Sequence, residues 1–551
     1  MTDRRRWYWV LSVVALAMLA AGLGLRDPWP ADEPRFALIA REMVASGEWL
    51  FPHRNGELYA DKPPLSLWLI ALGYVATGEL RLAFLLPSLL AGLATLALVV
   101  DLARRLWGTR PALYAGVLLL ISFQFAWQSR NAQIDAVLVG WTTLGLYGLA
   151  RHLLLGPAWG WCAISFLAMG AGVITKGVGF LPVLLLIPWA LARWRRTRGL
   201  AAVGADWRWL VALLLLVPIA AWLLPMLQAV AASNDPALAA YRDNILVKQT
   251  AGRYADPSHH FKPPWYYLIQ IWPLWAPLSL LLPWAIPAWW RRVRRGDGRQ
   301  QLLLGWVILV LAFFSFSPAK RGVYIYPALP ALAVAMAPLL PGLLRRREVH
   351  MMALGLTIVL GLALLAAGIV IAAGLVPAWL LARAAAEGVD RGMLASLALP
   401  ALLAGGLAAI SIALGRIRHA PLALAGTLVF AWIIAASLIL PRLNPARQPG
   451  ALMVRADALV DEAGALGMVR YKEQYVLMAP RGLTTFGYQR RDPAAEMAEA
   501  VAWLRARPGR VLLISEDRLA TAPVVRERLL PLGRAHDDDW YAARVEALTQ
   551  P

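Results

Sequence analysis

Apolar residues form long uninterrupted runs along the first four fifths of the chain, and short polar segments separate these runs. A helix needs roughly 20 apolar residues to cross the hydrocarbon core of a membrane. The runs predict thirteen membrane-spanning helices, at residues 7–25, 82–102, 110–127, 133–152, 159–174, 178–193, 208–228, 266–289, 301–316, 322–342, 351–375, 392–415 and 420–441. We interpret the first run as an uncleaved anchor, because many more spans follow it. The pattern therefore predicts a polytopic α-helical membrane protein.

One further apolar stretch, 65–78, is shorter and follows two prolines. We assign it to a juxtamembrane helix in the first outer loop, because counting it as a span would invert every later loop. Without it, arginine-rich segments such as "RWRRTRGL" and "RRVRRGDGRQ" fall on the same side as Arg4–Arg6. Cytoplasmic loops carry an excess of Lys and Arg. The thirteen-span topology therefore places these segments inside and the C-terminal segment outside.

The pattern changes after residue 442. Charged residues become frequent, and a helical pattern, "AAEMAEAVAWLRA", precedes a strand pattern, "RVLLISED". A segment of about 100 residues is long enough to fold by itself. The sequence thus predicts two domains: a membrane domain over 1–442 and a small soluble α/β domain over 443–551 on the outer side.

The composition supports the membrane assignment. Hydrophobic residues make up 60% of the 551 residues and charged residues only 16%, whereas a soluble protein has about 25% charged residues. A formal net charge of +21 is also typical of nucleic-acid binding, but here the arginines lie in short loops between apolar runs. We therefore expect membrane lipids around the chain and no nucleic-acid partner. The single cysteine, Cys162, excludes an intrachain disulfide.

The lysines are distributed differently from the arginines. Among the 54 Lys and Arg residues only six are lysines, and the topology puts all six on the outer side: Lys62, Lys176, Lys248, Lys262, Lys320 and Lys472. The positive-inside rule disfavours cations there, so we interpret these lysines as candidate functional residues. Contacts with lipid phosphates are the alternative interpretation.

Carboxylates are predicted on the same face. Asp32 and Glu33 follow the first span, Asp61 precedes Lys62 in "NGELYADKPPLSLWL", and Asp135 opens the fourth span. An unpaired carboxylate is costly to bury, so acids at span ends point to function. Together the acids and cations suit a substrate with a phosphate and a group that needs orientation or deprotonation.

Five motifs occur in a characteristic order: "RFALIAREM", "LYADKPPLSLW", "TKG", "HHFKPPWYYL" and "SPAKRGVYIYPALPALA". With them the chain resembles the membrane glycosyltransferases of the GT-C class, in particular the bacterial aminoarabinose transferases that modify lipid A, and more distantly protein mannosyltransferases. The resemblance covers roughly residues 7–440. It implies a GT-C fold with thirteen spans and a C-terminal periplasmic domain, in the bacterial inner membrane.

The resemblance also implies roles for particular residues. Asp32 and Asp135 match acids of the catalytic loops, and Glu33 beside Asp32 is a third candidate. The implied polyprenyl phosphate site consists of Arg35, Lys62, Lys176, Lys320, Arg321 and Tyr324. Members of the class can hold a divalent metal, zinc or magnesium, which implies Asp61 and His260 as ligands, with His259 as the neighbouring candidate. The usual acid is Glu, one methylene longer than Asp61. Two ligands make a weak site, and both histidines are alternatively ordinary interfacial loop residues.

The implied function is an inverting glycosyltransferase. It would move a sugar, aminoarabinose, from an undecaprenyl phosphate donor to lipid A at the periplasmic face. One alternative keeps the polyprenyl-phosphate-linked donor and changes the acceptor to a protein or another glycan. Another alternative is a lipid transporter or flippase. Transporters tend to show paired repeats and polar residues at the bilayer midplane, whereas the charges here gather in the outer loops.

Overall fold

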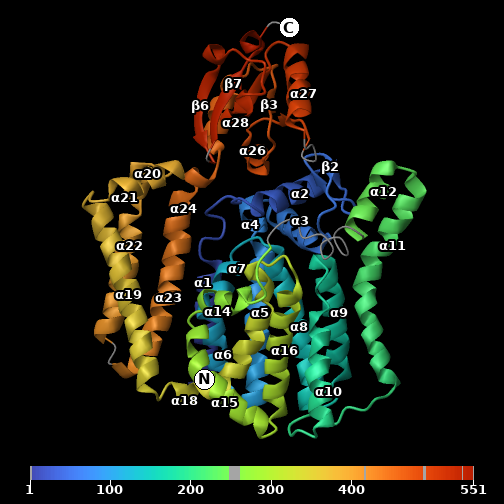
Figure 1. The fold of residues 1–551 in the computed structure, drawn as a ribbon, viewed down its shortest axis with the longest axis vertical. Coiled ribbons are helices and arrows are strands. Elements are labelled where there is room, and N and C mark those ends of the chain that lie inside the picture. Colours follow the sequence, from blue (N-terminus) through green and yellow to red (C-terminus); the bar gives the residue numbers. More distant parts are fainter. Residues whose placement is uncertain (1–2, 247–260, 415–416, 488–491, 537, 550–551) are drawn as a thin grey trace.

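The computed structural model describes residues 3–246, 261–414, 417–487, 492–536 and 538–549. Long helices run side by side and form most of the molecule, and a smaller part with a β-sheet lies at one end of them (Figure 1). The N-terminus lies towards the opposite end. The chain is thus a polytopic helical membrane protein with a small C-terminal mixed sheet, as predicted.

A helix overlaps each of the thirteen predicted apolar stretches. These helices are α1 Asp3–Ala20, α5 Leu86–Trp107, α6 Thr109–Ile121, α8 Ile134–Leu155, α9 Trp159–Lys176, α10 Leu186–Trp194, α11 Leu216–Ser233, α15 Leu282–Arg294, α16 Gly298–Phe316, α17 Ala328–Met336, α19 Arg347–Ala372, α22 Ala398–Leu414 and α23 Ala420–Ile434. In the described part of the chain, six helices are long and apolar enough to cross a membrane, or seven with one bent pair. The number thirteen therefore stays a prediction.

The predicted span 266–289 is not one continuous helix. Helix α14 (Tyr266–Leu274) and the helical run Ser279–Arg294 are bent by 109° where they meet. Pro273 lies inside α14, and Pro277 lies in the break. Proline has no backbone N–H to donate and its ring clashes with the preceding turn, so it kinks or ends a helix. The two prolines account for the break that the apolar pattern did not reveal.

Short elements between α1 and α5 lie at the end of the bundle nearest the sheet (Figure 1). They are α2 (Glu33–Ser46), a hairpin of β1 (His53–Arg54) and β2 (Glu57–Leu58), α3 (Leu65–Thr77) and α4 (Leu80–Ala83). The 13 residues of α3 span about 20 Å, which is too short for a membrane of about 30 Å. Phe36, Ile39 and Met43 of α2 pack with Leu67 and Ile70 of α3. The stretch 65–78 is therefore a short helix packed on α2, as predicted.

The C-terminal part contains a five-stranded sheet with strand order β4-β3-β5-β7-β6. Its strands are β3 Leu466–Met468, β4 Leu483–Thr485, β5 Val511–Ser515, β6 Leu530–Ala535 and β7 Asp538–Ala543. Strand β3 pairs in parallel with β4 and β5, and β7 pairs antiparallel with β5 and β6. Helices α25 (Gly450–Asp457), α26 (Glu473–Met478) and α27 (Pro493–Ala506) accompany them. Strand β5 and helix α27 confirm the two predicted patterns, whereas the domain boundary after residue 442 stays a prediction.

Candidate active site

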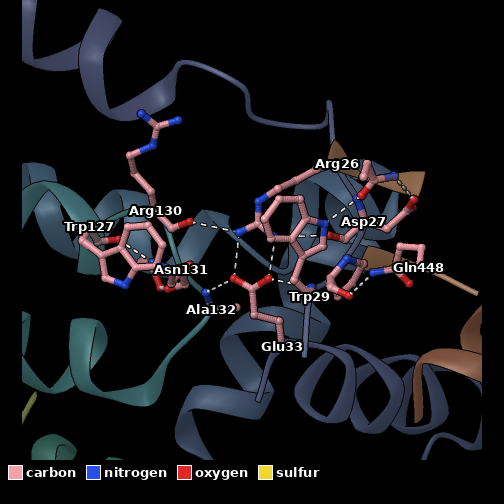
Figure 2. Close-up of polar contacts among 12 residues, drawn as sticks. Arg26, Asp27, Trp29, Glu33, Trp127, Arg130, Asn131, Ala132 and Gln448 are labelled. Carbon is pink, nitrogen blue, oxygen red and sulfur yellow. Dashed lines mark hydrogen bonds and ion pairs between the residues drawn. The ribbon is translucent and has the colours of Figure 1, made fainter. Parts of the chain in front are cut away.

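Glu33, the first residue of α2, is buried, and its carboxylate accepts four hydrogen bonds (Figure 2). Arg26 donates two of them, from Nη1 at 2.5 Å and from Nη2 at 2.8 Å. The backbone N–H of Trp29 donates at 2.8 Å and that of Ala132 at 3.0 Å. Arg26 also donates to the carbonyl of Arg130. Glu33 thus ties the start of α2 to the segment that precedes α8.

This geometry favours a structural role for Glu33, and its catalytic role stays a prediction. A carboxylate offers about four lone-pair positions, and the protein itself fills all four. No position is left to accept a proton from a substrate. Because Ala132 lies three residues before Asp135, Glu33 instead holds the two segments that carry the other predicted acids. Nothing in the local sequence indicated that Arg26 would be buried against Glu33.

Asp32 is placed differently, although it is the adjacent residue. It occupies the N-cap position of α2 but makes no side-chain capping bond. A quarter of its side chain is exposed, and its ion-pair partner is Arg35 of the next turn, with 3.8 Å between Oδ1 and Nη1. Its side chain is therefore partly accessible, as a catalytic or orienting acid requires.

Arg35 faces the carboxylate of Glu473, a residue of the C-terminal part that was not predicted from the sequence. Glu473, at the start of α26, lies 3.3 Å from Nε of Arg35 and 2.5 Å from Nη2 of Arg54. Burial alone lowers the pKa of Arg35, but Tyr59, Glu473 and Asp32 raise it, and the net pKa lies above its usual value. Arg35 therefore keeps its full charge inside a mixed cluster. The separation of 438 positions along the chain explains why no sequence pattern connects Arg35 with Glu473.

The fully buried Tyr59 joins Asp61 to this cluster. Its hydroxyl lies near Arg35 but makes no hydrogen bond within the described part of the chain. Burial raises the pKa of Tyr59, the negative charge of Asp61 raises it further, and Arg35 opposes the change. Asp61 and Lys62 are themselves half-buried. Their neighbour Ala60 packs with Ile174, two residues before the end of α9. The segment "YADK" therefore lies between Arg35 of α2 and the end of α9.

Three other predicted residues meet at the ends of α8 and α9. Asp135, in the first turn of α8, forms an ion pair with Lys176, the last residue of α9. Only 11% and 15% of these two side chains are exposed. The Lys176 ammonium also lies 4.7 Å from the ring centre of Tyr324, within range of a cation–π interaction. This pairing places a lysine, an acid and an aromatic ring together at the ends of α8 and α9.

Tyr324 belongs to the segment that also carries Lys320 and Arg321. Lys320 is buried, and its ammonium donates to the carbonyls of Lys262 at 3.0 Å and Ser317 at 2.6 Å. Arg321 is exposed, and its backbone carbonyl accepts a bond from Tyr267. The contact between Tyr324 and Lys176 therefore brings this segment to the end of α9.

The predicted metal ligands are only partly covered by the structure. His259 and His260 lie outside the described residues. Among the described residues, no group of three or more His, Cys, Asp or Glu side chains has the arrangement of a metal site. Binding of zinc or magnesium by Asp61 and a histidine thus stays a prediction.

Sequence comparisons connect the chain to enzymes that act on lipid-linked sugars. A family model described as dolichyl-phosphate-mannose-protein mannosyltransferase matches residues 61–224. The undecaprenyl phosphate-alpha-4-amino-4-deoxy-L-arabinose arabinosyl transferase of Pseudomonas paraeruginosa is 34% identical over 372 residues. The match covers 66% of this chain and 65% of that protein, so the chain spans slightly less than two thirds of this relative's length.

Structural comparisons identify the fold. ArnT from Cupriavidus metallidurans, bound to undecaprenyl phosphate, superposes with a TM-score of 0.74 at 22% identity, with 99% of both chains covered. The archaeal oligosaccharyltransferase AglB from Archaeoglobus fulgidus gives a TM-score of 0.50 at 14% identity over 88% of this chain and 65% of that chain. The chain has the fold of ArnT. The predicted resemblance to GT-C glycosyltransferases of the aminoarabinose transferase type is confirmed.

Proposed function

We propose that this protein is an inverting glycosyltransferase that moves aminoarabinose from undecaprenyl phosphate to lipid A. The observation that carries the proposal is the 34% identity over 372 residues to a transferase that uses this donor. The cluster of carboxylates and cations at one end of the helices supports it, because these groups suit a phosphate-linked sugar.

The proposal includes an orientation in the membrane. It keeps thirteen crossings and puts the site and the C-terminal part on the periplasmic side of the bacterial inner membrane. Basic last turns of α10 and α15, with Arg193 and with Arg291, Arg292 and Arg294, support this orientation. Both helices lie towards the end that is remote from the sheet (Figure 1), and arginine-rich segments are typical of the cytoplasmic side.

In the proposed reaction an acceptor oxygen attacks the anomeric carbon of the sugar. The bond between that carbon and the phosphate oxygen breaks, and the phosphate leaves with the electron pair, so the configuration inverts. The leaving group changes from a phosphodiester with one negative charge to a monoester with two. Lys176 and Arg35 stabilise the doubly charged leaving phosphate more strongly than they stabilise the singly charged phosphate of the bound donor. Lysine supplies a point charge and arginine a two-pronged fork for the phosphate oxygens.

The role of Asp32 depends on the acceptor. A hydroxyl acceptor must lose a proton, and Asp32 would take it as a general base. A lipid A phosphate is already anionic and needs no deprotonation, so Asp32 would then orient the acceptor or the amino group of the sugar. Both roles require the partly exposed carboxylate beside Arg35.

A protein acceptor is the second candidate. The match of residues 61–224 to a model described as a protein mannosyltransferase is the observation that favours it. In that case the donor phosphate would be held in the same way, and Asp32 would act on a hydroxyl side chain.

The proposed function is tested by mass spectrometry of lipid A. A Gram-negative strain that makes the undecaprenyl-linked sugar but lacks its own transferase is compared with and without this chain. We expect the mass increment of aminoarabinose on lipid A only in cells with the chain. Unchanged lipid A in cells that contain the folded protein would refute this acceptor, and labelled donor recovered on protein would favour the second candidate.

Lys176→Gln is expected to reduce transfer by at least about tenfold, because one phosphate-binding charge is lost and Asp135 is left unpaired. The double variant Asp135→Asn with Lys176→Gln removes both charges, so its thermal stability should recover towards that of the parent protein. Its transfer should stay low, since no cation is restored. Transfer rates and melting temperatures of the three proteins are measured together. Recovery of transfer along with stability would show that Lys176 only neutralises Asp135.

A further inference from the structure

A groove of about 480 Å³ lies between α1 and α5, away from the site described above. Its walls are mainly apolar and include Leu11 of α1 and Leu93, Leu96 and Val100 of α5. Residues beside it point away from the protein, since Val13, Leu16 and Leu90 have more than half of their surface exposed. In a membrane protein such a face contacts lipid, so the open side of the groove borders the bilayer.

One end of the groove is polar and basic. Asp101 and Arg104 line it. The Asp101 carboxylate accepts bonds from Arg104 at 2.6 Å, Arg105 at 2.5 Å and the Tyr147 hydroxyl at 2.6 Å. Arg151 in turn donates to the Tyr147 hydroxyl at 3.1 Å. Two arginines thus share the Asp101 carboxylate and a third bonds to the tyrosine, so the three arginines and one aspartate have a net charge of about +2 at neutral pH.

This polar end lies at the end of a predicted membrane span. It is formed by the last turns of α5, which ends at Trp107 and is followed by α6. The Tyr8 hydroxyl, at the start of α1, donates to the carbonyl of Thr109 in the same turn region. About half of the Arg104 side chain is exposed. An anion that arrives from the membrane surface can therefore reach its guanidinium, which is a bidentate phosphate donor.

We propose that this groove binds one anionic phospholipid from the leaflet at the N-terminal end of the bundle. An acyl chain lies along the apolar walls between α1 and α5, and the headgroup phosphate contacts Arg104 and Arg105. Charge complementarity selects the lipid, because basic pockets between membrane helices attract anionic headgroups over zwitterionic ones. The site is separate from the proposed transfer reaction and does not depend on it.

The test uses a fluorescent label beside the groove. Leu16→Cys carries a bimane label on the exposed face of α1, and the native Cys162 is buried and does not compete for the reagent. The full chain is reconstituted in phosphatidylcholine vesicles that contain brominated phosphatidylglycerol or, in parallel, brominated phosphatidylcholine. We expect half-maximal quenching at about five- to tenfold less brominated phosphatidylglycerol, given the attraction of each arginine for anionic lipid.

Two controls separate a specific site from a general preference for anionic lipid. The same label at Val359→Cys, on an exposed face of α19, should show equal quenching by both lipids. Arg104→Gln with Arg105→Gln should abolish the preference at position 16, whereas Arg110→Gln, an exposed arginine in the first turns of α6, should leave it. An equal preference at both label positions, or a preference that survives loss of Arg104 and Arg105, would overturn the proposal.

Discussion

Asp32→Asn is expected to lower the rate of sugar transfer by about 10²–10⁴-fold while the protein stays folded. That range is typical for the loss of a group that moves or directs a proton at the reacting centre. Asp32 suits this position because its side chain is partly exposed and makes no capping bond, and its ion-pair partner Arg35 is 3.8 Å away. Asparagine has nearly the same shape, so the change removes the charge and leaves the packing intact. Transfer is measured with purified protein at saturating donor.

Donor affinity distinguishes the two roles of Asp32. If it acts as a general base, Asp32→Asn lowers the rate and leaves the affinity for the donor unchanged. If it orients the substrate, donor affinity should weaken together with the rate. A variant with unchanged rate and unchanged affinity would remove Asp32 from the site altogether.

Glu33→Gln is expected to destabilise the protein by about 3–5 kcal/mol, which is the range for breaking a buried ion pair by removing one partner. The change leaves the buried Arg26 guanidinium without its counter-charge and weakens the bonds to Trp29 and Ala132. Loss of folded protein should therefore accompany any loss of transfer. The measurement is the yield and the thermal unfolding of the purified variant in detergent.

Asp32→Asn is the matched control for this second prediction, because it removes the same charge from the adjacent residue. We expect opposite signatures: Asp32→Asn is stable and inactive, and Glu33→Gln is unstable. The double variant Arg26→Gln with Glu33→Gln removes both buried charges, so it should regain part of the lost stability. A Glu33→Gln protein that is as stable as its parent but inactive would contradict our assignment and restore Glu33 as a catalytic acid.

The contrast between Asp32 and Glu33 shows what the sequence can and cannot predict about the site. Both acids follow the first span, and nothing in their neighbours distinguishes them. In the structure the Glu33 side chain points inward to Arg26, and the Asp32 side chain faces Arg35. This difference depends on the geometry at the start of α2. Asp135 and Lys176 could be singled out from the sequence because both lie at the ends of apolar runs, where charges are costly without a function. The structure pairs them, and their role in transfer stays a prediction.

The fold, like the site, could be predicted only in part from the sequence. Helices were predictable from apolar length, since each predicted stretch is helical. The break in 266–289 was missed because length and polarity do not report the bend at Pro273 and Pro277. The contact of Glu473 with Arg35 and Arg54 was missed for another reason: it depends on how the C-terminal part docks on α2. Contacts between distant segments leave no periodic signal in a single sequence.

The most direct test of the central claim is sugar transfer by the purified full-length protein in liposomes. Undecaprenyl phosphate with radiolabelled aminoarabinose is the donor, and lipid A in the same bilayer is the acceptor. We predict labelled lipid A and release of undecaprenyl phosphate in equal amounts, with both products reduced by about 10²-fold or more in Asp32→Asn. Release of the lipid phosphate without labelled lipid A would contradict the acceptor. Equal turnover by the parent and Asp32→Asn proteins would contradict the site.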